Sequence, residues 1–280
     1  MKVIRAKHAG FCYGVQRAAR IASELLHSGR KPIFTIGPLI HNPQEVARLA
    51  SLGILPREHI EDCVGAPTLI RTHGISIGEV RRAAEIGVEL IDATCPHVKA
   101  SRQYIGEFGR AGRTVLLFGD EGHPEVKALL SYAQGPIHVV RALTDLIELS
   151  PDTPIGIVAQ TTASSEAFEE IVEVVSRRHS HTTTVNTICE DTERRRAESR
   201  LLAATVDAMV VVGGKNSANT RRLVDLCRTI QPRTFGVEVA AELEEKQFLT
   251  IDSVGLTSGA STPEWIISDV EGWLRTKSRS

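Results

Sequence analysis

The sequence predicts an α/β protein made of three small, pseudo-repeated α/β lobes with parallel sheets. Short apolar runs alternate with amphipathic helical stretches along the whole chain, which is typical of repeated βα units. Cys12, Cys95 and Cys189 each follow a strand-like run and precede a helix-like segment. The two intervals between them each hold about three βα units, so the pattern predicts a threefold pseudo-repeat.

The elements follow one another in the order that this class requires. VIRAK precedes the amphipathic VQRAARIASELL, which stops at Gly29, and KPIFTIG and TLIRTHG each lead into another helical pattern closed by Gly. Six further strand-like runs each precede a helix-like segment: VELIDATC, TVLLFGD, PIGIVAQ, TTTVNTIC, DAMVVVGG and SVGLTSG. With boundaries near the three cysteines, the predicted lobes are 13–95, 96–188, and 1–12 together with 189–280.

Composition narrows the class of protein. The 280 residues are 42% hydrophobic and 24% charged, with a net charge of -1, so no general attraction to nucleic acid or to an anionic membrane is expected. The amino terminus MKVIRAKHAG lacks the apolar core of a secretory signal, and no apolar run approaches the roughly 18 residues that span a bilayer. We therefore expect a soluble, cytoplasmic protein.

The cysteines argue against a disulfide framework. There are five, far apart and without any CxxC pair, which also disfavours a zinc ribbon. Three equivalent cysteines do not resemble one nucleophile. A Cys₃ zinc site and an iron–sulfur cluster both remain open, and three ligands for four irons would leave one iron for substrate. Cys63 and Cys227 lack this context and are expected to be ordinary cysteines.

Polar side chains follow nearly every predicted strand, although one such residue alone is usually a helix cap or turn former. Ligands of open α/β sheets bind outside the carboxyl ends of the strands. GGKNSANT and SGASTPEW follow apolar runs and open helices, so their backbone N–H groups and hydroxyls can face an anion. With two histidines they predict a diphosphate pocket. The strand-end residues are His41, His73, His123, Glu125, Gln160, Thr161, Thr162, the stretch 213–220 and Ser261.

GHPEV has two interpretations. A carboxylic acid in a closed, partly dry site has a raised pKa and can deliver protons near neutral pH, which would make Glu125 a general acid. Alternatively, Pro124 and Glu125 simply open a helix, since proline suits its first position and an acidic residue suits its amino-terminal dipole.

Nine motifs in register resemble the 4-hydroxy-3-methylbut-2-enyl diphosphate reductase family from residue 2 to about residue 274. They are AGFCYGV, GPLIHNPQEV, RTHGIS, DATCPHV, GHPEV, AQTT, NTIC, GGKNSANT and GASTPEWII. The resemblance implies a trefoil of three lobes around a central cavity and a reductive dehydroxylation. The products implied are isopentenyl and dimethylallyl diphosphate, with electrons delivered singly by ferredoxin or flavodoxin.

The resemblance also implies roles for residues of this chain. Cys12, Cys95 and Cys189 would ligate one [4Fe–4S] cluster whose fourth iron has no protein ligand. Thr161 and Glu125, with His123, would organise and supply the proton. The diphosphate of the allylic substrate would be held by six residues: His41, His73, His123, Ser217, Asn219 and Ser261.

The segment after the third cysteine departs from the family pattern. The family normally reads Ala-Thr, two variable residues, then Arg-Gln-Glu, whereas CEDTERRRA keeps Thr192 and Arg195 but has Asp191, Arg196 and Ala197. These changes leave every expected ligand in place. They keep two alternatives open, namely a diverged paralogue acting as an iron–sulfur sensor or diphosphate-binding protein, and a Cys₃ zinc phosphohydrolase.

Overall fold

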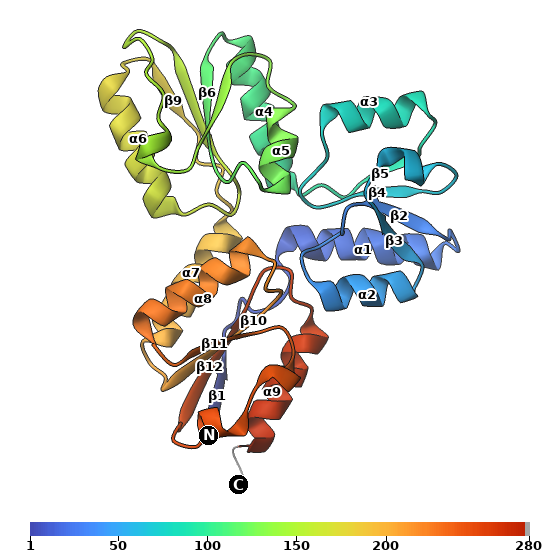
Figure 1. Cartoon of the computed structure of the whole chain (residues 1–280), viewed down its shortest axis with the longest axis vertical. Coiled ribbons are helices and arrows are strands. Elements are labelled where there is room, and N and C mark those ends of the chain that lie inside the picture. The colour runs from blue at the N-terminus through green and yellow to red at the C-terminus, as the bar shows by residue number, and fades with distance from the viewer. Residues whose placement is uncertain (278–280) are drawn as a thin grey trace. The chain divides into compact units, whose positions relative to one another are not determined.

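The computed structural model describes residues 1–277 and contains three sheets, each of four parallel strands, alternating with helices (Figure 1). This confirms the predicted α/β class with parallel sheets. The strand order is the same in each sheet. When the strands of a sheet are numbered along the chain from β2 (Ile33–Ile36), β6 (Thr114–Phe118) or β10 (Ala208–Val212), their order in the sheet is 2-1-3-4. In the third sheet, strand 4 is β1, which comes from the start of the chain.

The first sheet has the order β3-β2-β4-β5, with the strands β2 Ile33–Ile36, β3 Ile54–Arg57, β4 Thr68–Ile70 and β5 Leu90–Asp92. Phe34, Ile36 and Ile70 pack against Ala83 of helix α3 and against Cys63. The helices that precede or follow these strands along the chain are α1 Tyr13–His27, α2 Pro43–Ser51, α3 Ile77–Glu85 and the short 3₁₀ helix η1 Ile60–Cys63.

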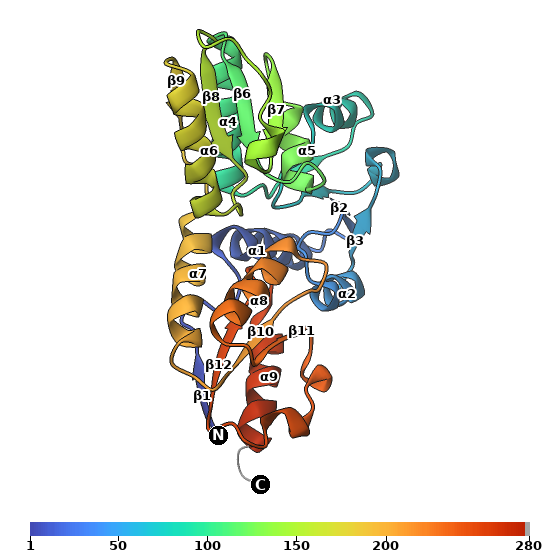
Figure 2. The ribbon, with the colours of Figure 1, turned by 60° about the vertical axis from the view of Figure 1, so that its left-hand side comes forward.

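The second sheet has the order β7-β6-β8-β9, and Figure 2 shows its strands side by side. Its strands are β6 Thr114–Phe118, β7 Ile137–Val140, β8 Ile155–Ala159 and β9 Thr182–Thr184. Alternate residues of β6 face opposite ways, so Leu116 packs on α6 while Val115 and Leu117 pack on α4 and α5. The remaining elements are α4 Pro96–Arg110, α5 Pro124–Leu130, η2 Leu143–Asp145 and α6 Ser165–Arg178.

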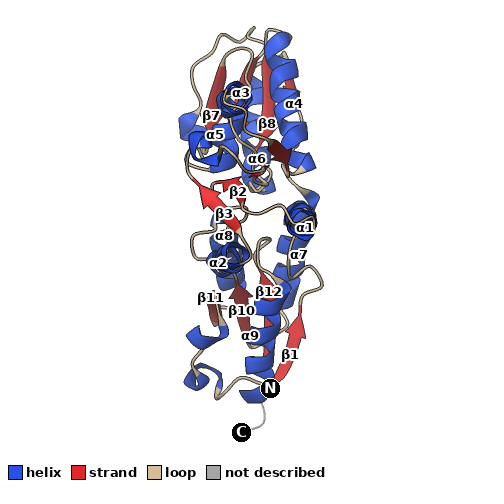
Figure 3. Cartoon of the chain, turned by 90° about the vertical axis from the view of Figure 1, so that its right-hand side faces the viewer, coloured by secondary structure: helices blue, strands red, loops and turns tan. Residues whose placement is uncertain are grey.

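The third sheet has the order β1-β12-β10-β11, and β1 pairs in parallel with β12 in register from Lys2 with Ser253 to Arg5 with Leu256. Val210 and Leu256 pack on α9, whereas Met209 packs on α8 from the opposite face. Figure 3 shows the strands of this sheet together with helix α9. The elements are β1 Lys2–Arg5, α7 Glu190–Ala203, β10 Ala208–Val212, α8 Ala218–Ile230, β11 Thr234–Val237, η3 Ala240–Glu242, η4 Glu245–Phe248, β12 Ser253–Ser258 and α9 Glu264–Lys277.

Local sequence explains where the helices begin and end. Asn42 accepts the backbone N–H of Glu45 and is followed by Pro43 at the first position of α2. Ser76 and Glu79 form a reciprocal capping box at the start of α3. Helix α1 is followed at Gly29 by a left-handed turn with φ of 76°, a conformation that favours glycine.

The chain divides into two compact units. Unit 1 comprises Met1–Gln16, Ile40–Leu52 and the chain from Glu190 onward, and unit 2 comprises Arg17–Leu39 and Gly53–Cys189. Unit 1 therefore contains the third sheet and helix α2, and unit 2 contains the first and second sheets. The lobe boundaries expected from the cysteine spacing stay a prediction.

Candidate functional site

The repeated 2-1-3-4 order explains where the polar strand-end residues lie. In sheets of this order the connections after strands 1 and 3 leave in opposite directions, and ligands bind at the crevice between those two strand ends. The residues after strand 1 of the three sheets are His41, His123 and Ser217, and those after strand 3 are His73, Thr161 and Ser261. Six of the predicted ligand-binding residues thus follow topologically equivalent strands of the three sheets.

The three candidate metal-binding cysteines also occupy equivalent places. Each follows the fourth strand of its sheet and directly precedes a helix: Cys12 before α1, Cys95 before α4 and Cys189 before α7. Each donates its backbone N–H to a carbonyl in the loop after strand 3, at 2.9 Å in all three cases. The accepting carbonyls belong to Ala260 for Cys12, Thr72 for Cys95 and Thr161 for Cys189.

The surroundings of the five thiols separate candidate ligands from core residues. Cys12, Cys95 and Cys189 are partly exposed at helix amino termini, where the helix dipole favours a negatively charged ligand atom. Cys63 and Cys227 are fully buried, and burial raises the pKa of both thiols, that of Cys227 to about 11. The three strand-end cysteines therefore fit a soft metal centre, and the two buried ones do not.

Glu125 forms the most distinctive polar contact in unit 2. Its side chain is completely buried, and its two oxygens accept the backbone N–H of Thr161 at 2.7 Å and the hydroxyl of Thr161 at 2.8 Å. Burial raises the pKa of Glu125 to about 7, although the two hydrogen bonds from Thr161 act in the opposite direction. A carboxyl group with this pKa can both hold and release a proton near neutral pH.

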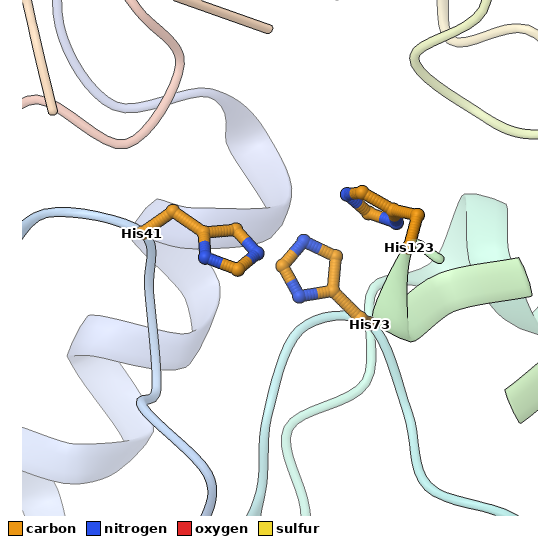
Figure 4. Close-up of side chains that lie close together, drawn as sticks. All are labelled: His41, His73 and His123. Atoms are coloured by element: carbon orange, nitrogen blue, oxygen red, sulfur yellow. The ribbon is translucent and has the colours of Figure 1, made fainter. Parts of the chain in front are cut away.

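His123 joins this group through the start of α5. Its Nδ1 accepts the backbone N–H of Glu125 at 3.2 Å, so in the neutral ring the proton lies on Nε2, which can donate. The ring also meets that of His73 edge to face, with 5.2 Å between ring centroids (Figure 4). The structure thus brings His73, His123, Glu125 and Thr161 together within unit 2.

Unit 1 holds the other predicted binding residues. Ser217 caps α8 by accepting the backbone N–H of Thr220, and Asn219 lies in the first turn of the same helix. Ser261 donates its hydroxyl to the backbone carbonyl of His41 at 3.1 Å. A side chain at Gly214 would approach that carbonyl to within 2.9 Å, so glycine there permits the close approach of the two loops.

A second contact fixes the segment that carries His41. Glu45 in α2 is buried, and one of its oxygens accepts Nε1–H of Trp265 at 2.9 Å. The guanidinium of Arg48 donates to both oxygens of the same carboxylate, at 2.8 and 2.6 Å. Helix α2 is therefore anchored to α9 of unit 1.

Sequence reasoning missed several residues that shape these loops. Arg195 is buried, with only 3% exposed, and Glu198 accepts hydrogen bonds from the loop before Cys12. The first three turns of α7 contain almost no apolar residue, yet Thr192, Arg195 and Ser199 are buried at helical spacing. The signal available in the sequence was the missing apolar stripe, because a helix that packs on the protein without one must bury polar side chains.

These features define a three-sheet α/β protein with polar side chains at its strand ends and three thiols suited to a soft metal. The chain belongs to the LytB protein family, whose model matches residues 3–275.

Relatives and solved structures cover nearly the whole chain. A 4-hydroxy-3-methylbut-2-enyl diphosphate reductase of Geobacter sp. strain M21 is 44% identical over 271 residues, 96% of this chain and 95% of the relative. The protein of the same name from Aquifex aeolicus is 42% identical over 98% of this chain and 96% of its own.

Two solved structures share the fold. A structure of (E)-4-hydroxy-3-methyl-but-2-enyl diphosphate reductase, the terminal enzyme of the non-mevalonate pathway, is 41% identical with a TM-score of 0.77, covering 99% of this chain and 100% of that one. The E-1-hydroxy-2-methyl-but-2-enyl-4-diphosphate reductase of Plasmodium falciparum is 25% identical with a TM-score of 0.91, covering 98% and 87%.

Among residues 1–277, no helix combines the length and the apolar character needed to cross a membrane.

Proposed function

We propose that this protein is an oxidoreductase that removes the hydroxyl group of 4-hydroxy-3-methylbut-2-enyl diphosphate, giving isopentenyl and dimethylallyl diphosphate. Membership of the LytB family and the names of its relatives support this assignment. The observation that carries it is the completely buried Glu125, whose carboxylate accepts both the backbone N–H and the hydroxyl of Thr161 at a strand end. The reaction consumes two electrons and two protons and releases one water.

Cys12, Cys95 and Cys189 would hold one [4Fe–4S] cluster per chain. Their equivalent positions, partial exposure and helix-terminal setting support this ligand set. When bound, the cluster supplies electrons one at a time and an iron without a protein ligand. Ferredoxin or flavodoxin in the cytoplasm is the proposed electron donor.

The diphosphate would be held by the donors after strands 1 and 3. In unit 1 these are the hydroxyls of Ser217 and Ser261, the amide of Asn219 and the ring of His41. In unit 2 they are the rings of His73 and His123, which already contact each other. Hydrogen bonds to a charged group contribute about 1.5–3 kcal/mol each, so several of them suffice to orient a diphosphate.

Glu125 and Thr161 would deliver the proton. When the carboxylate is ionised, the Thr161 hydroxyl donates to it. When Glu125 is protonated, its O–H can donate to Thr161 instead, which turns the hydroxyl hydrogen of Thr161 outward. A proton can therefore pass from the buried carboxyl to a substrate atom beside Thr161 without movement of the backbone.

The test is anaerobic turnover of iron-reconstituted protein, followed by oxidation of a one-electron donor after addition of the hydroxylated diphosphate. Wild-type protein and Glu121→Gln should oxidise the donor promptly, because Glu121 is an exposed carboxylate in the loop that precedes α5. Glu125→Gln should slow oxidation by roughly 10²–10⁴-fold.

Other outcomes would support the alternatives. A brown protein that binds the diphosphate without oxidising the donor would be a sensor or a diphosphate-binding protein. A colourless zinc protein that releases phosphate would be a hydrolase.

A further inference from the structure

Two side chains on one face of α7 reach the loop that leads to Cys12. Arg195 and Glu198 are three residues apart and therefore lie on the same side of the helix. Arg195 is buried and donates from its two terminal nitrogens to the carbonyls of Ser258 and Gly10, at 3.0 Å each. One guanidinium thus links the end of β12 to the loop before Cys12.

Glu198 holds the same loop two to three residues earlier. One of its oxygens accepts the backbone N–H of Lys7 at 2.6 Å, and the other accepts the backbone N–H and Nδ1 of His8 at 2.9 and 2.8 Å. Burial opposes ionisation of Glu198, but the hydrogen bonds from residues 7 and 8 outweigh it and lower its pKa. The charged acceptor is therefore maintained at neutral pH.

The loop carries its own link to the third sheet. The backbone N–H of Gly10 donates to the hydroxyl of Ser258 at 2.7 Å, and that of Cys12 donates to the carbonyl of Ala260 at 2.9 Å. Gly10 turns the chain with φ of 115°, which lies in the region that favours glycine. Cys12 thus follows a sharp turn at Gly10, and Arg195 of α7 holds the carbonyl of Gly10.

A second arginine makes the corresponding contact within unit 2. Arg17 donates from its terminal nitrogens to the carbonyls of Thr94 and Asp92, at 3.2 and 3.4 Å. Asp92 is the last residue of β5, and Thr94 lies in the loop that leads from β5 to Cys95. Each of these two cysteine loops is therefore fixed through its backbone carbonyls by an arginine from a helix elsewhere in the chain.

We propose that Arg195 and Glu198 are positioning residues for Cys12, and that Arg17 is the positioning residue for Cys95. These residues act on the backbone of the loops that lead to the two cysteines. They hold the two thiols in place before a metal centre is assembled, which lowers the conformational cost of binding it. The metal named here rests on the proposed function, whereas the positioning of the loops does not.

The test is amide hydrogen exchange of the full, iron-free chain, measured for residues 9–12 and 93–95. Arg195→Ala and Glu198→Ala should each raise the exchange rate about tenfold in residues 9–12 and leave it unchanged in residues 93–95. The reason is that such hydrogen bonds oppose the local opening through which amides exchange. Arg17→Ala should do the reverse.

Matched controls lie on the same helices. Arg194→Ala and Arg20→Ala remove exposed ion pairs with Glu190 and Glu24, and neither should change exchange in the two segments. Arg195→Lys can reach only one of the two carbonyls and should give an intermediate rise. This variant and Arg17→Ala keep the test informative if Arg195→Ala does not fold.

A second readout uses the reconstituted protein. Release of iron to a chelator should be about tenfold faster in the three alanine variants than in wild type and the controls. Equal exchange in both segments, or unchanged exchange in both, would overturn the positioning roles. Wild-type protein that takes up no iron would instead overturn the proposed function, and the exchange pattern would still decide the positioning roles.

Discussion

Replacing Glu125 by glutamine should make the protein more stable at neutral and alkaline pH while slowing turnover by roughly 10²–10⁴-fold. Glutamine has the shape of the protonated carboxyl. Its oxygen can accept the N–H of Thr161, and its amide can donate to the Thr161 hydroxyl, so both contacts of Glu125 persist. The variant differs from wild type mainly in lacking a buried group that must ionise.

The magnitude follows from the pKa. Burial raises the pKa of Glu125 from its ordinary 4.5 to about 7, and one pKa unit corresponds to about 1.4 kcal/mol. The folded state therefore binds this proton more tightly than the unfolded state. The tighter binding of this proton stabilises the folded protein by about 3 kcal/mol. This stabilisation is complete below about pH 4.5 and is lost as the pH rises through about 7.

Urea unfolding of the iron-free proteins across this pH range measures the effect. The stability of Glu125→Gln relative to wild type should rise by about 2–3 kcal/mol between about pH 5 and pH 8. Glu121→Gln, which changes an exposed carboxylate, should show no such rise. A difference between Glu125→Gln and wild type that stays flat with pH would refute the raised pKa and, with it, the proton-donor role.

Three further predictions concern the rest of the site. Thr161→Val keeps the backbone N–H to Glu125 but removes the hydroxyl, so turnover should fall at least tenfold, and Thr161→Ser should restore most of it. Ser261→Ala should weaken diphosphate binding about tenfold by isothermal titration, and unchanged affinity would exclude Ser261 from the anion site. Cys189→Ser should leave less bound iron per chain after reconstitution, whereas Cys227→Ala should retain iron and lose about 1–3 kcal/mol of stability from its buried core position. Equal iron content in both cysteine variants would contradict the ligand assignment.

The alternation of βα units and the cysteine spacing sufficed to predict the class of fold. Both signals are local, because period and turn residues reflect the conformation of neighbouring residues. The 2-1-3-4 strand order was not predicted. It depends on the pairing of strands that are far apart in the sequence, such as β1 and β12, which lie near opposite ends of the described chain.

The sequence indicated candidate site residues but not the contacts between them. Strand-end motifs indicated Glu125 and Thr161, yet their double hydrogen bond depends on how the fold brings α5 to the loop after β8. Arg195 and Glu198 escaped prediction of a role, since a charged helix surface normally faces solvent and only the folded loop before Cys12 reveals their acceptors and donors. The same limit applies to Arg17.

The central claim is a reductive dehydroxylation, and the ratio of electrons to product tests it most directly. The measurement is product analysis by mass spectrometry in an anaerobic reaction that contains a known amount of one-electron donor. The account predicts isopentenyl and dimethylallyl diphosphate, with two electrons consumed for each molecule formed. Loss of the substrate with release of phosphate and no oxidation of the donor would contradict it.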